Sequence, residues 1–228
     1  MSQVDAAIGG KTAVNLFNIK NLIGTINQPQ AVFIDINWLK TLPKREFSSG
    51  MAEIIKYGIG FDNEILKLIS GRISHKNLLN IIEKAICVKV QAVEKDPHET
   101  RGIRKLLNLG HTLGHSLEAQ QNMNLNHGES VAVGLLFTAY IAFKNNNITG
   151  KELFKIQKIL SGFSLPLKVK IDINRSMEKI MHDKKRINNA VEFITIRKIG
   201  RASSSIMSRK QLKVHLKNFS KYITNFIC

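Results

Sequence analysis

Asn108-Leu-Gly-His111-Thr-Leu-Gly-His115-Ser-Leu-Glu118 is the stretch of sequence that decides the fold, and it is followed by Asn126-His127-Gly-Glu129. Residues four apart share one face of a helix, so His111 and His115 are expected to point toward one site. His127 follows a predicted turn and precedes a long apolar helix. Imidazoles placed in this way indicate a divalent metal centre, and Glu53, in a second helical stretch, offers the carboxylate that such a centre needs.

The bulk composition describes an ordinary globular protein. The chain has 228 residues, enough for one domain or for one domain and part of another, and 43% of them are hydrophobic. Cys87 and Cys228 lie far apart and give neither a disulfide framework nor a cysteine zinc site, which favours a reducing cytoplasm. The longest apolar run, 130–143, is too short to span a bilayer, and the first ten residues do not resemble a signal peptide. We therefore expect a cytoplasmic protein with no membrane partner.

The formal net charge of +17 needs a separate explanation. A nucleic-acid partner is one interpretation, because a basic surface attracts phosphate. However, the lysines are scattered, the densest run is only 183–186, and no nucleic-acid-binding motif accompanies them. A phosphorylated, anionic small substrate explains the charge about as well, and nucleic-acid binding is disfavoured as a primary role.

The pattern of apolar residues and of helix-breaking glycines predicts a mainly helical chain. Residues 1–30 resemble a loop, and 31–35 reads as a short buried strand. Strand-like alternation over 191–196 can pair with 203–207 across Gly200. The helices are predicted at 44–58, 62–70, 76–94, 105–121, 128–145, 150–162 and 209–225.

Several independent blocks, in the right order, resemble the 3-dehydroquinate synthase family. The most specific are Gly50-Met-Ala-Glu53-Ile-Ile-Lys56-Tyr-Gly58, the stretch 104–115 and the stretch 127–132. Further blocks lie at 3–15, 20–24, 28–30 and 39–43, and Asp183-Lys184-Lys185 precedes the strand pair. The likeness covers essentially the whole chain, which is similar to the C-terminal two thirds of such enzymes.

The resemblance implies a fold, two domains and partners. It implies an all-helical metal-binding C-terminal domain over 44–228, with a small strand pair near its end. Residues 1–43 would be a remnant of the α/β nucleotide-binding domain. The glycine loop that cradles the NAD pyrophosphate is absent from this sequence, so we expect a truncated or split synthase that binds NAD weakly unless a separate N-terminal chain supplies that part. A homodimer is also implied.

The reaction implied is that of a phosphate-eliminating lyase in the shikimate pathway of aromatic amino acid biosynthesis. A seven-carbon keto sugar-acid phosphate would become 3-dehydroquinate and phosphate. NAD would oxidise a hydroxyl, phosphate would be eliminated, the ketone would be reduced again and the ring would close. Zinc or cobalt would hold vicinal substrate oxygens.

The resemblance also assigns roles to individual residues. The metal ligands would be Glu53, His111 and His127. Positions matching substrate contacts and proton handling are Lys56, His115, Arg104, Asn108, Asp5, Asn21, Lys89 and Lys184. Positions matching nucleotide contacts are Lys11, Lys20, Trp38, Leu39, Lys40 and Thr41.

Two alternatives to this enzyme stay open at the level of sequence. A related sugar-phosphate cyclase would share the fold and the metal but take another substrate, and Arg104 with Lys184 favours the dehydroquinate reaction over it. A non-catalytic metal-binding remnant would keep the ligands without turnover.

Overall fold

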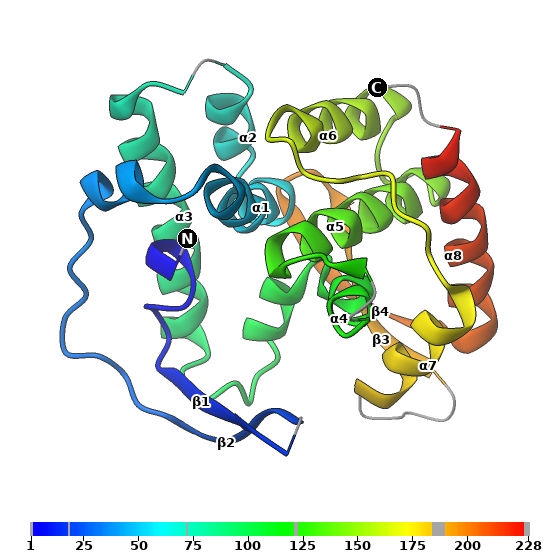
Figure 1. The fold of residues 1–228 in the computed structure, drawn as a ribbon, viewed down its shortest axis with the longest axis horizontal. Coiled ribbons are helices and arrows are strands. Elements are labelled where there is room, and N and C mark those ends of the chain that lie inside the picture. Colours follow the sequence, from blue (N-terminus) through cyan, green and yellow to red (C-terminus); the bar gives the residue numbers. More distant parts are fainter. Residues whose placement is uncertain (1, 18, 72, 121–122, 184–189, 226–228) are drawn as a thin grey trace.

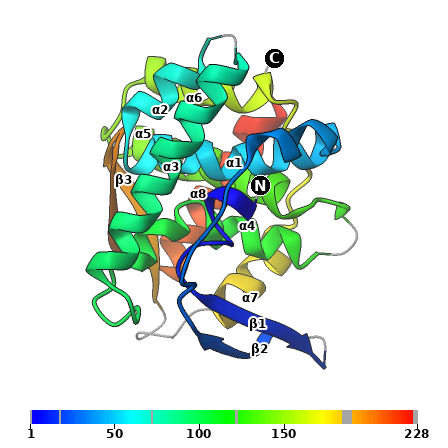
Figure 2. The ribbon, with the colours of Figure 1, turned by 90° about the vertical axis from the view of Figure 1, so that its left-hand side faces the viewer.

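The computed structural model describes every residue except 1, 18, 72, 121–122, 184–189 and 226–228. Figure 1 shows a body of helices from which a two-stranded hairpin extends near the N-terminus, and Figure 2 shows the same hairpin hanging below the helices. None of the helices in these described residues combines the length and the apolar character needed to cross a membrane.

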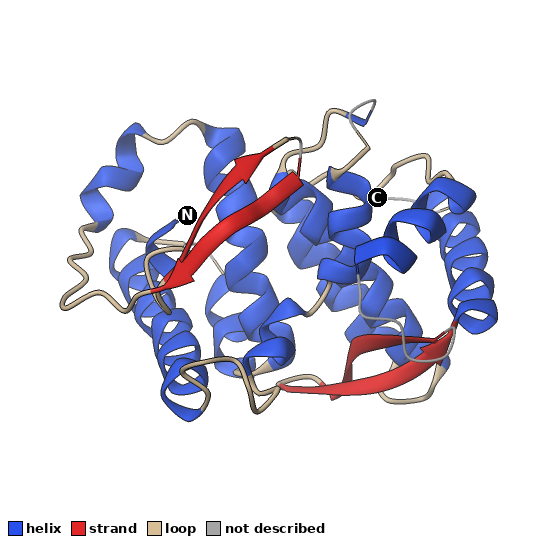
Figure 3. Cartoon of the chain, turned by 90° about the horizontal axis from the view of Figure 1, so that it is seen from below, coloured by secondary structure: helices blue, strands red, loops and turns tan. Residues whose placement is uncertain are grey.

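Helices form most of the described chain. The α-helices are α1 (Lys44–Gly60), α2 (Asn63–Ile69), α3 (His75–Lys95), α4 (His111–Glu118), α5 (His127–Lys144), α6 (Gly150–Gly162), α7 (Ile173–Asp183) and α8 (Arg209–Thr224). Short 3-10 helices are η1 (Ser2–Val4), η2 (Ile36–Thr41) and η3 (Arg104–Asn108). The strands form two separate antiparallel pairs, β1 (Lys11–Leu16) with β2 (Ile19–Ile26) and β3 (Ala190–Lys198) with β4 (Arg201–Ser208) (Figure 3).

Helix α5 is the centre of the core. Its residues 128–142 are all buried, and it packs against α4, α1, α6, α8 and β3. Phe137 on α5 meets Phe193 of β3 at 5.9 Å and Phe219 of α8 at 5.1 Å between ring centroids. A helix that is apolar all round is stable only when covered on every side, so α5 fixes the positions of the elements around it.

The first turn of α5 is held by two sets of contacts. Asn126 and Glu129 form a reciprocal capping box that satisfies free N–H groups at the start of the helix. The guanidinium of Arg45 on α1 donates to both carboxylate oxygens of Glu129 at 2.7 Å, and to the Asn124 carbonyl at 2.8 Å. These contacts fix His127, the first residue of α5, relative to α1.

Most helices predicted from the sequence are confirmed to within about two residues, and so is the strand pair near the C-terminus. The single helix predicted over 105–121 is wrong, because η3 ends before Leu109 and α4 begins at His111. Gly110, with φ 79°, makes the break, and a Cβ there would lie 2.8 Å from the Leu135 backbone nitrogen. Only glycine combines this backbone conformation with so close an approach to α5.

The N-terminal predictions needed correction. Residues 11–16 and 19–26 pair as the strands of a hairpin rather than forming a loop, with Gly24 opposite Ala13. The strand predicted over 31–35 is wrong: this run has no regular secondary structure, and Phe33 is 96% exposed. A short apolar run becomes a buried strand only beside a neighbouring strand, and none lies beside it in the described part of the chain.

Helix α7 was not predicted. The stretch 168–172 alternates like a strand, which masks the helical pattern that follows it. Ile173, Met177, Ile180 and Met181 follow the spacing of an amphipathic helix, and Asp172 accepts a hydrogen bond from the Arg175 backbone nitrogen at 3.0 Å.

Candidate metal centre and substrate site

Three elements bring the predicted metal ligands together. Glu53 lies in the middle of α1, His111 begins α4 and His127 begins α5. Their ligand atoms all lie within 4.8 Å of one another. Glu53 and His127 are 74 residues apart in sequence and meet His111 because α1 and α4 both pack on α5.

The donor geometry fits a tetrahedral metal ion. The Nε2 atoms of His111 and His127 lie 3.5 and 3.2 Å from the same oxygen, Oε1 of Glu53. Ligand atoms at about 2.0 Å from zinc in a tetrahedron are about 3.3 Å apart, which agrees with both distances. One carboxylate and two imidazoles, with positions left for substrate, are a common set for catalytic zinc.

Each ligand imidazole has its other ring nitrogen engaged. Nδ1 of His111 lies 3.0 Å from the Leu109 carbonyl oxygen, whose direction is set by the break at Gly110. Nδ1 of His127 lies 3.0 Å from Oε2 of Glu118. An acceptor at Nδ1 keeps the proton there and leaves the Nε2 lone pair for a metal.

Burial and charge give the three predicted ligands different protonation properties. Burial opposes the charged form of Glu53, but Lys56, followed by His111 and His127, holds the pKa of its carboxyl well below the usual range. Burial lowers the pKa of His111 to about 4. Hydrogen bonds to Glu118 and then to Glu53 raise the pKa of His127 to about 9. A metal ion bound here would therefore displace a proton from His127.

Lys56 joins the metal cluster to a second polar network. Its ammonium pairs with Oε2 of Glu53 one turn earlier on α1 and lies 4.5 Å from the ring centroid of Tyr57. Tyr57 donates to Asp5 Oδ1 at 3.0 Å, and the same oxygen accepts from Lys89 on α3. Predicted substrate residues from three separate segments therefore line one continuous polar region.

Arg104 and Asn108 lie on η3, just ahead of His111. The buried Arg104 guanidinium donates to the Pro97 carbonyl at 2.9 Å and to the Gly9 carbonyl at 3.0 Å. Asn108 ends η3 and is partly buried. Arg104 thus connects the N-terminal loop to the segment that carries the histidines.

His115 lies one helical turn after His111, as predicted. Its ring centroid is 5.1 Å from that of His111 and 6.1 Å from that of His127. It contributes to a second group of donors, with Glu118 and His127, whose ligand atoms also lie within 4.8 Å of one another.

The predicted nucleotide residues do not join this cluster in the described structure. Lys11 pairs with Glu99 at 2.5 Å, and the stretch 38–41 forms most of the largely exposed η2. The side chains of Lys20 and Asn21 are not described, and Lys184 lies outside the described residues. The described sheets are antiparallel pairs and give no parallel sheet with a helix N-terminus to cradle a pyrophosphate.

Three functional candidates were missed by sequence reasoning. Glu118 ends α4 at a spacing of three from His115, so its position on the histidine face was readable from the sequence. Asp96 accepts backbone hydrogen bonds from Thr100, Arg101 and Arg104. Neither Asp96 nor Glu99 belongs to a local pattern that would have singled it out.

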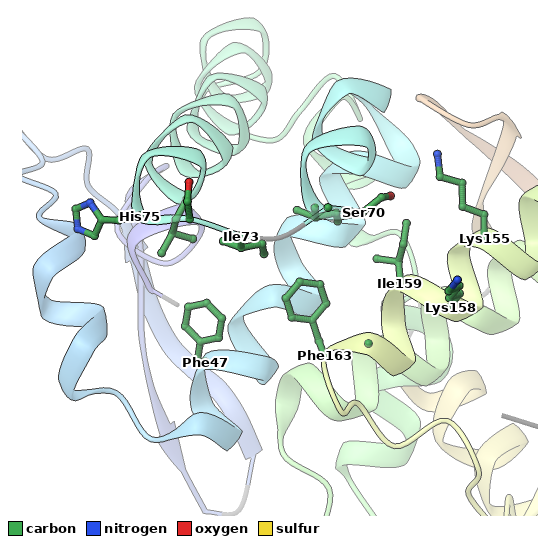
Figure 4. Close-up of a pocket in the computed structure, with 13 residues that line it drawn as sticks. Phe47, Ser70, Ile73, His75, Lys155, Lys158, Ile159 and Phe163 are labelled. Carbon is green, nitrogen blue, oxygen red and sulfur yellow. The ribbon is translucent and has the colours of Figure 1, made fainter.

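A large surface groove lies elsewhere. It has a volume of about 760 Å³ between α1, α6 and the segment joining α2 to α3, and Phe47 and Phe163 lie in it (Figure 4). Lys155 and Lys158 stand at its α6 side (Figure 4). None of the predicted metal, substrate or nucleotide residues lines this groove, so it is not the candidate site.

Comparisons with known proteins identify the family of this chain. The family model described as 3-dehydroquinate synthase C-terminal matches residues 50–186, and the one described as 3-dehydroquinate synthase N-terminal matches residues 1–49. A 3-dehydroquinate synthase of Campylobacter concisus is 42% identical over 205 residues, covering 89% of this chain and 59% of the relative. The Helicobacter pylori enzyme is 38% identical and covers 94% of this chain and 63% of the relative. The chain thus spans about three fifths of these relatives.

Solved structures show the same fold at lower identity. The 2-epi-5-epi-valiolone synthase of Streptomyces hygroscopicus, solved with NAD+ and Zn2+, has a TM-score of 0.85 at 22% identity, covering 97% of this chain and 64% of that one. A 2-deoxy-scyllo-inosose synthase, solved with carbaglucose-6-phosphate, NAD+ and Co2+, has a TM-score of 0.79 at 23% identity, covering 95% of this chain and 64% of that one. Because the C-terminal family model alone matches more than half of its residues, this chain belongs to the 3-dehydroquinate synthase family.

Proposed function

We propose that this chain forms the metal- and substrate-binding part of a 3-dehydroquinate synthase, a phosphate-eliminating lyase of the shikimate pathway. The observation that carries the proposal is the cluster of Glu53, His111 and His127, in which two Nε2 atoms converge on one carboxylate oxygen. The named activity of the curated relatives, at about 40% identity, supports the choice of reaction.

Zinc or cobalt is the metal that this donor set fits, held by Glu53, His111 and His127. When bound, such an ion supplies Lewis-acid stabilisation of substrate oxygens. Lys56 stays paired with Oε2 of Glu53, which keeps that carboxylate ionised and leaves its Oε1 facing His111 and His127.

Cationic side chains of this chain would hold the anionic substrate. Lys56 and Lys89 are buried and both interact with Asp5, and the buried Arg104 donates to the Gly9 carbonyl. We assign to these three cations the binding of the carboxylate and phosphate of a keto sugar-acid phosphate. Asp5 fixes the Lys89 ammonium, and Tyr57 fixes Asp5. We assign to His115, next to the metal ligands, the transfer of a proton at the substrate.

NAD, which supplies hydride transfer, would contact Lys11, Lys20 and the stretch 38–41 only together with further polypeptide of the α/β type. Exposed apolar side chains support this part of the proposal. Phe17, Ile23, Phe33 and Trp38 are each more than half exposed along the N-terminal segment. We infer that this surface packs against the α/β portion that the relatives contain, either in a longer form of this chain or in a separate chain. The cytoplasmic location and the homodimer stay predictions.

The decisive experiment measures phosphate release from the seven-carbon keto sugar-acid phosphate with zinc and NAD. The chain is assayed alone and with the N-terminal two fifths of the Campylobacter concisus relative supplied as a separate polypeptide. We expect turnover only in the mixture, and its loss in H127A. Calorimetry with NAD gives a second measurement, because micromolar binding by the chain alone would contradict the need for that partner.

Two outcomes would change the proposal. Turnover of a different sugar phosphate, with none of the keto sugar acid, would favour a related cyclase, which the fold shared with valiolone and deoxy-scyllo-inosose synthases supports as the second candidate. Zinc binding without turnover in either preparation would favour a metal-binding remnant.

A further inference from the structure

His127 is the ligand whose orientation packing alone does not fix. Its side chain is 41% exposed, whereas those of Glu53 and His111 are only 7% and 8% exposed. His111 is buried and has a backbone carbonyl at its Nδ1. A half-exposed ring at the first position of a helix needs another contact to hold its rotation and its tautomer.

Glu118 provides that contact. It is the last residue of α4, and its Oε2 lies 3.0 Å from Nδ1 of His127. On the other side of the ring, Nε2 lies 3.2 Å from Glu53. Glu118 and His111 both lie on α4, which packs against α5, so one helix carries one predicted ligand and the hydrogen-bond partner of the other.

We propose that Glu118 is the positioning residue for His127. Its carboxylate holds the proton on Nδ1 and turns Nε2 toward Glu53 and His111, where the metal binds. This inference rests on the metal site of the proposed function and names the residue that completes it. A carboxylate behind a ligand imidazole also makes that imidazole a stronger donor.

The other reading of the same residues is a second cation held by His115, Glu118 and His127, whose donors also lie within 4.8 Å of one another. That arrangement requires His127 to donate lone pairs from both ring nitrogens. A neutral imidazole has only one, because the other nitrogen carries the proton. The Nδ1 to Oε2 distance is also that of an ordinary hydrogen bond. The geometry therefore favours positioning over a second metal.

The test compares zinc binding by the wild-type chain, E118A, E118Q, H127A and the control E94Q, which changes an exposed glutamate on α3. Affinity is measured by competition with a chelating dye, and stoichiometry by elemental analysis. The His127 tautomer is read from nitrogen-15 spectra of the zinc-loaded protein. We expect E118A to weaken zinc binding about 10- to 100-fold at an unchanged stoichiometry of about one. In the wild type zinc should bind Nε2 and the proton should remain on Nδ1, whereas in E118A a second form with the two nitrogens exchanged should also appear. E94Q should match the wild type.

The outcomes separate this inference from the proposed function. Equal zinc affinity and the same tautomer in E118A and the wild type would overturn the role of Glu118, even with H127A defective. A stoichiometry that falls from two to one in E118A would show that Glu118 is itself a ligand. Equal binding by H127A and the wild type would instead remove the metal site, and the role of Glu118 with it.

Discussion

Replacing Gly134 with Ala tests how closely α4 and α5 must approach for the site to form. A Cβ at Gly134 would lie 2.8 Å from the Gly110 carbonyl carbon and 3.0 Å from the Gly114 nitrogen, and closer still to the Gly110 oxygen. Ordinary contact begins at 3.4 Å and the Gly110 oxygen is the nearest atom, so the two backbones must separate by more than the roughly 0.6 Å that the carbonyl carbon alone requires. His111 follows Gly110 directly and would move with it.

Two effects of opposite sign decide the stability of G134A. Overpacking costs about 3 kcal/mol, the upper end of the usual range, because backbone cannot yield as a side chain can. Alanine in a helix gains up to about 1 kcal/mol over glycine. We therefore expect the free energy of unfolding of G134A, measured by urea denaturation, to be about 2 kcal/mol lower than that of the wild type. Zinc affinity should fall at least about tenfold, since ligand geometry tolerates only about 0.5 Å of displacement.

G162A is the matched control, because a Cβ at Gly162 in α6 meets nothing within 4 Å. It should be neutral or stabilise the protein by up to about 1 kcal/mol, and zinc affinity should not change. This expectation is refuted if the free energies of unfolding of G134A and G162A agree within about 0.5 kcal/mol and G134A binds zinc as tightly as the wild type. Close packing of α4 on α5 would then not position His111.

Three further predictions concern a buried carboxylate, a helix cap and the metal. Burial opposes ionisation of Asp96, but N–H groups of Arg101, Arg104 and Thr100 lower its pKa, so its stabilisation is present above about pH 4 and lost as pH falls through the lowered value. D96N should therefore have a lower free energy of unfolding than the wild type at pH 7, measured in urea. Below pH 4 this free energy should fall less in D96N than in the wild type, and parallel pH profiles of the two proteins would contradict this. S208A removes the side-chain cap of α8 and should lower the free energy of unfolding by about 1 kcal/mol. The control S204A changes an exposed serine and should lower it by less than about 0.5 kcal/mol. Zinc at about 100 times its dissociation constant should raise the free energy of unfolding by about 2.7 kcal/mol relative to the protein kept metal-free with a chelator. An unchanged melting temperature on adding zinc would count against the site.

Local patterns in the sequence were enough to predict most of the helical body. Helix-breaking glycines and apolar periodicity locate α1, α3, α5, α6 and α8, because both depend on residues within a few positions of each other. The same local logic placed His111 and His115 on one face and Lys56 one turn from Glu53, and the structure confirms both.

Local patterns failed where a distant segment decides the conformation. The break at Gly110 exists because α4 approaches the backbone of α5, and nothing near residue 110 reveals that approach. The run 31–35 has the composition of a buried strand but lacks a neighbour to pair with in the described chain. Hairpin β1–β2 was hidden by glycines that usually mark loops, although its β-branched residues favour strands.

The sequence by itself determined the family, most of the helices and the identity of the metal-ligand candidates, because these follow from residue types at fixed spacings. Only the tertiary structure decided which ring nitrogen of each histidine faces Glu53, and that Glu118 lies behind His127. It also decided that Lys11 reaches Glu99 and that Arg104 reaches Gly9. The physical reason is that hydrogen bonds act over about 3 Å, so partners far apart in sequence are defined only once packing on α5 has fixed where their elements lie.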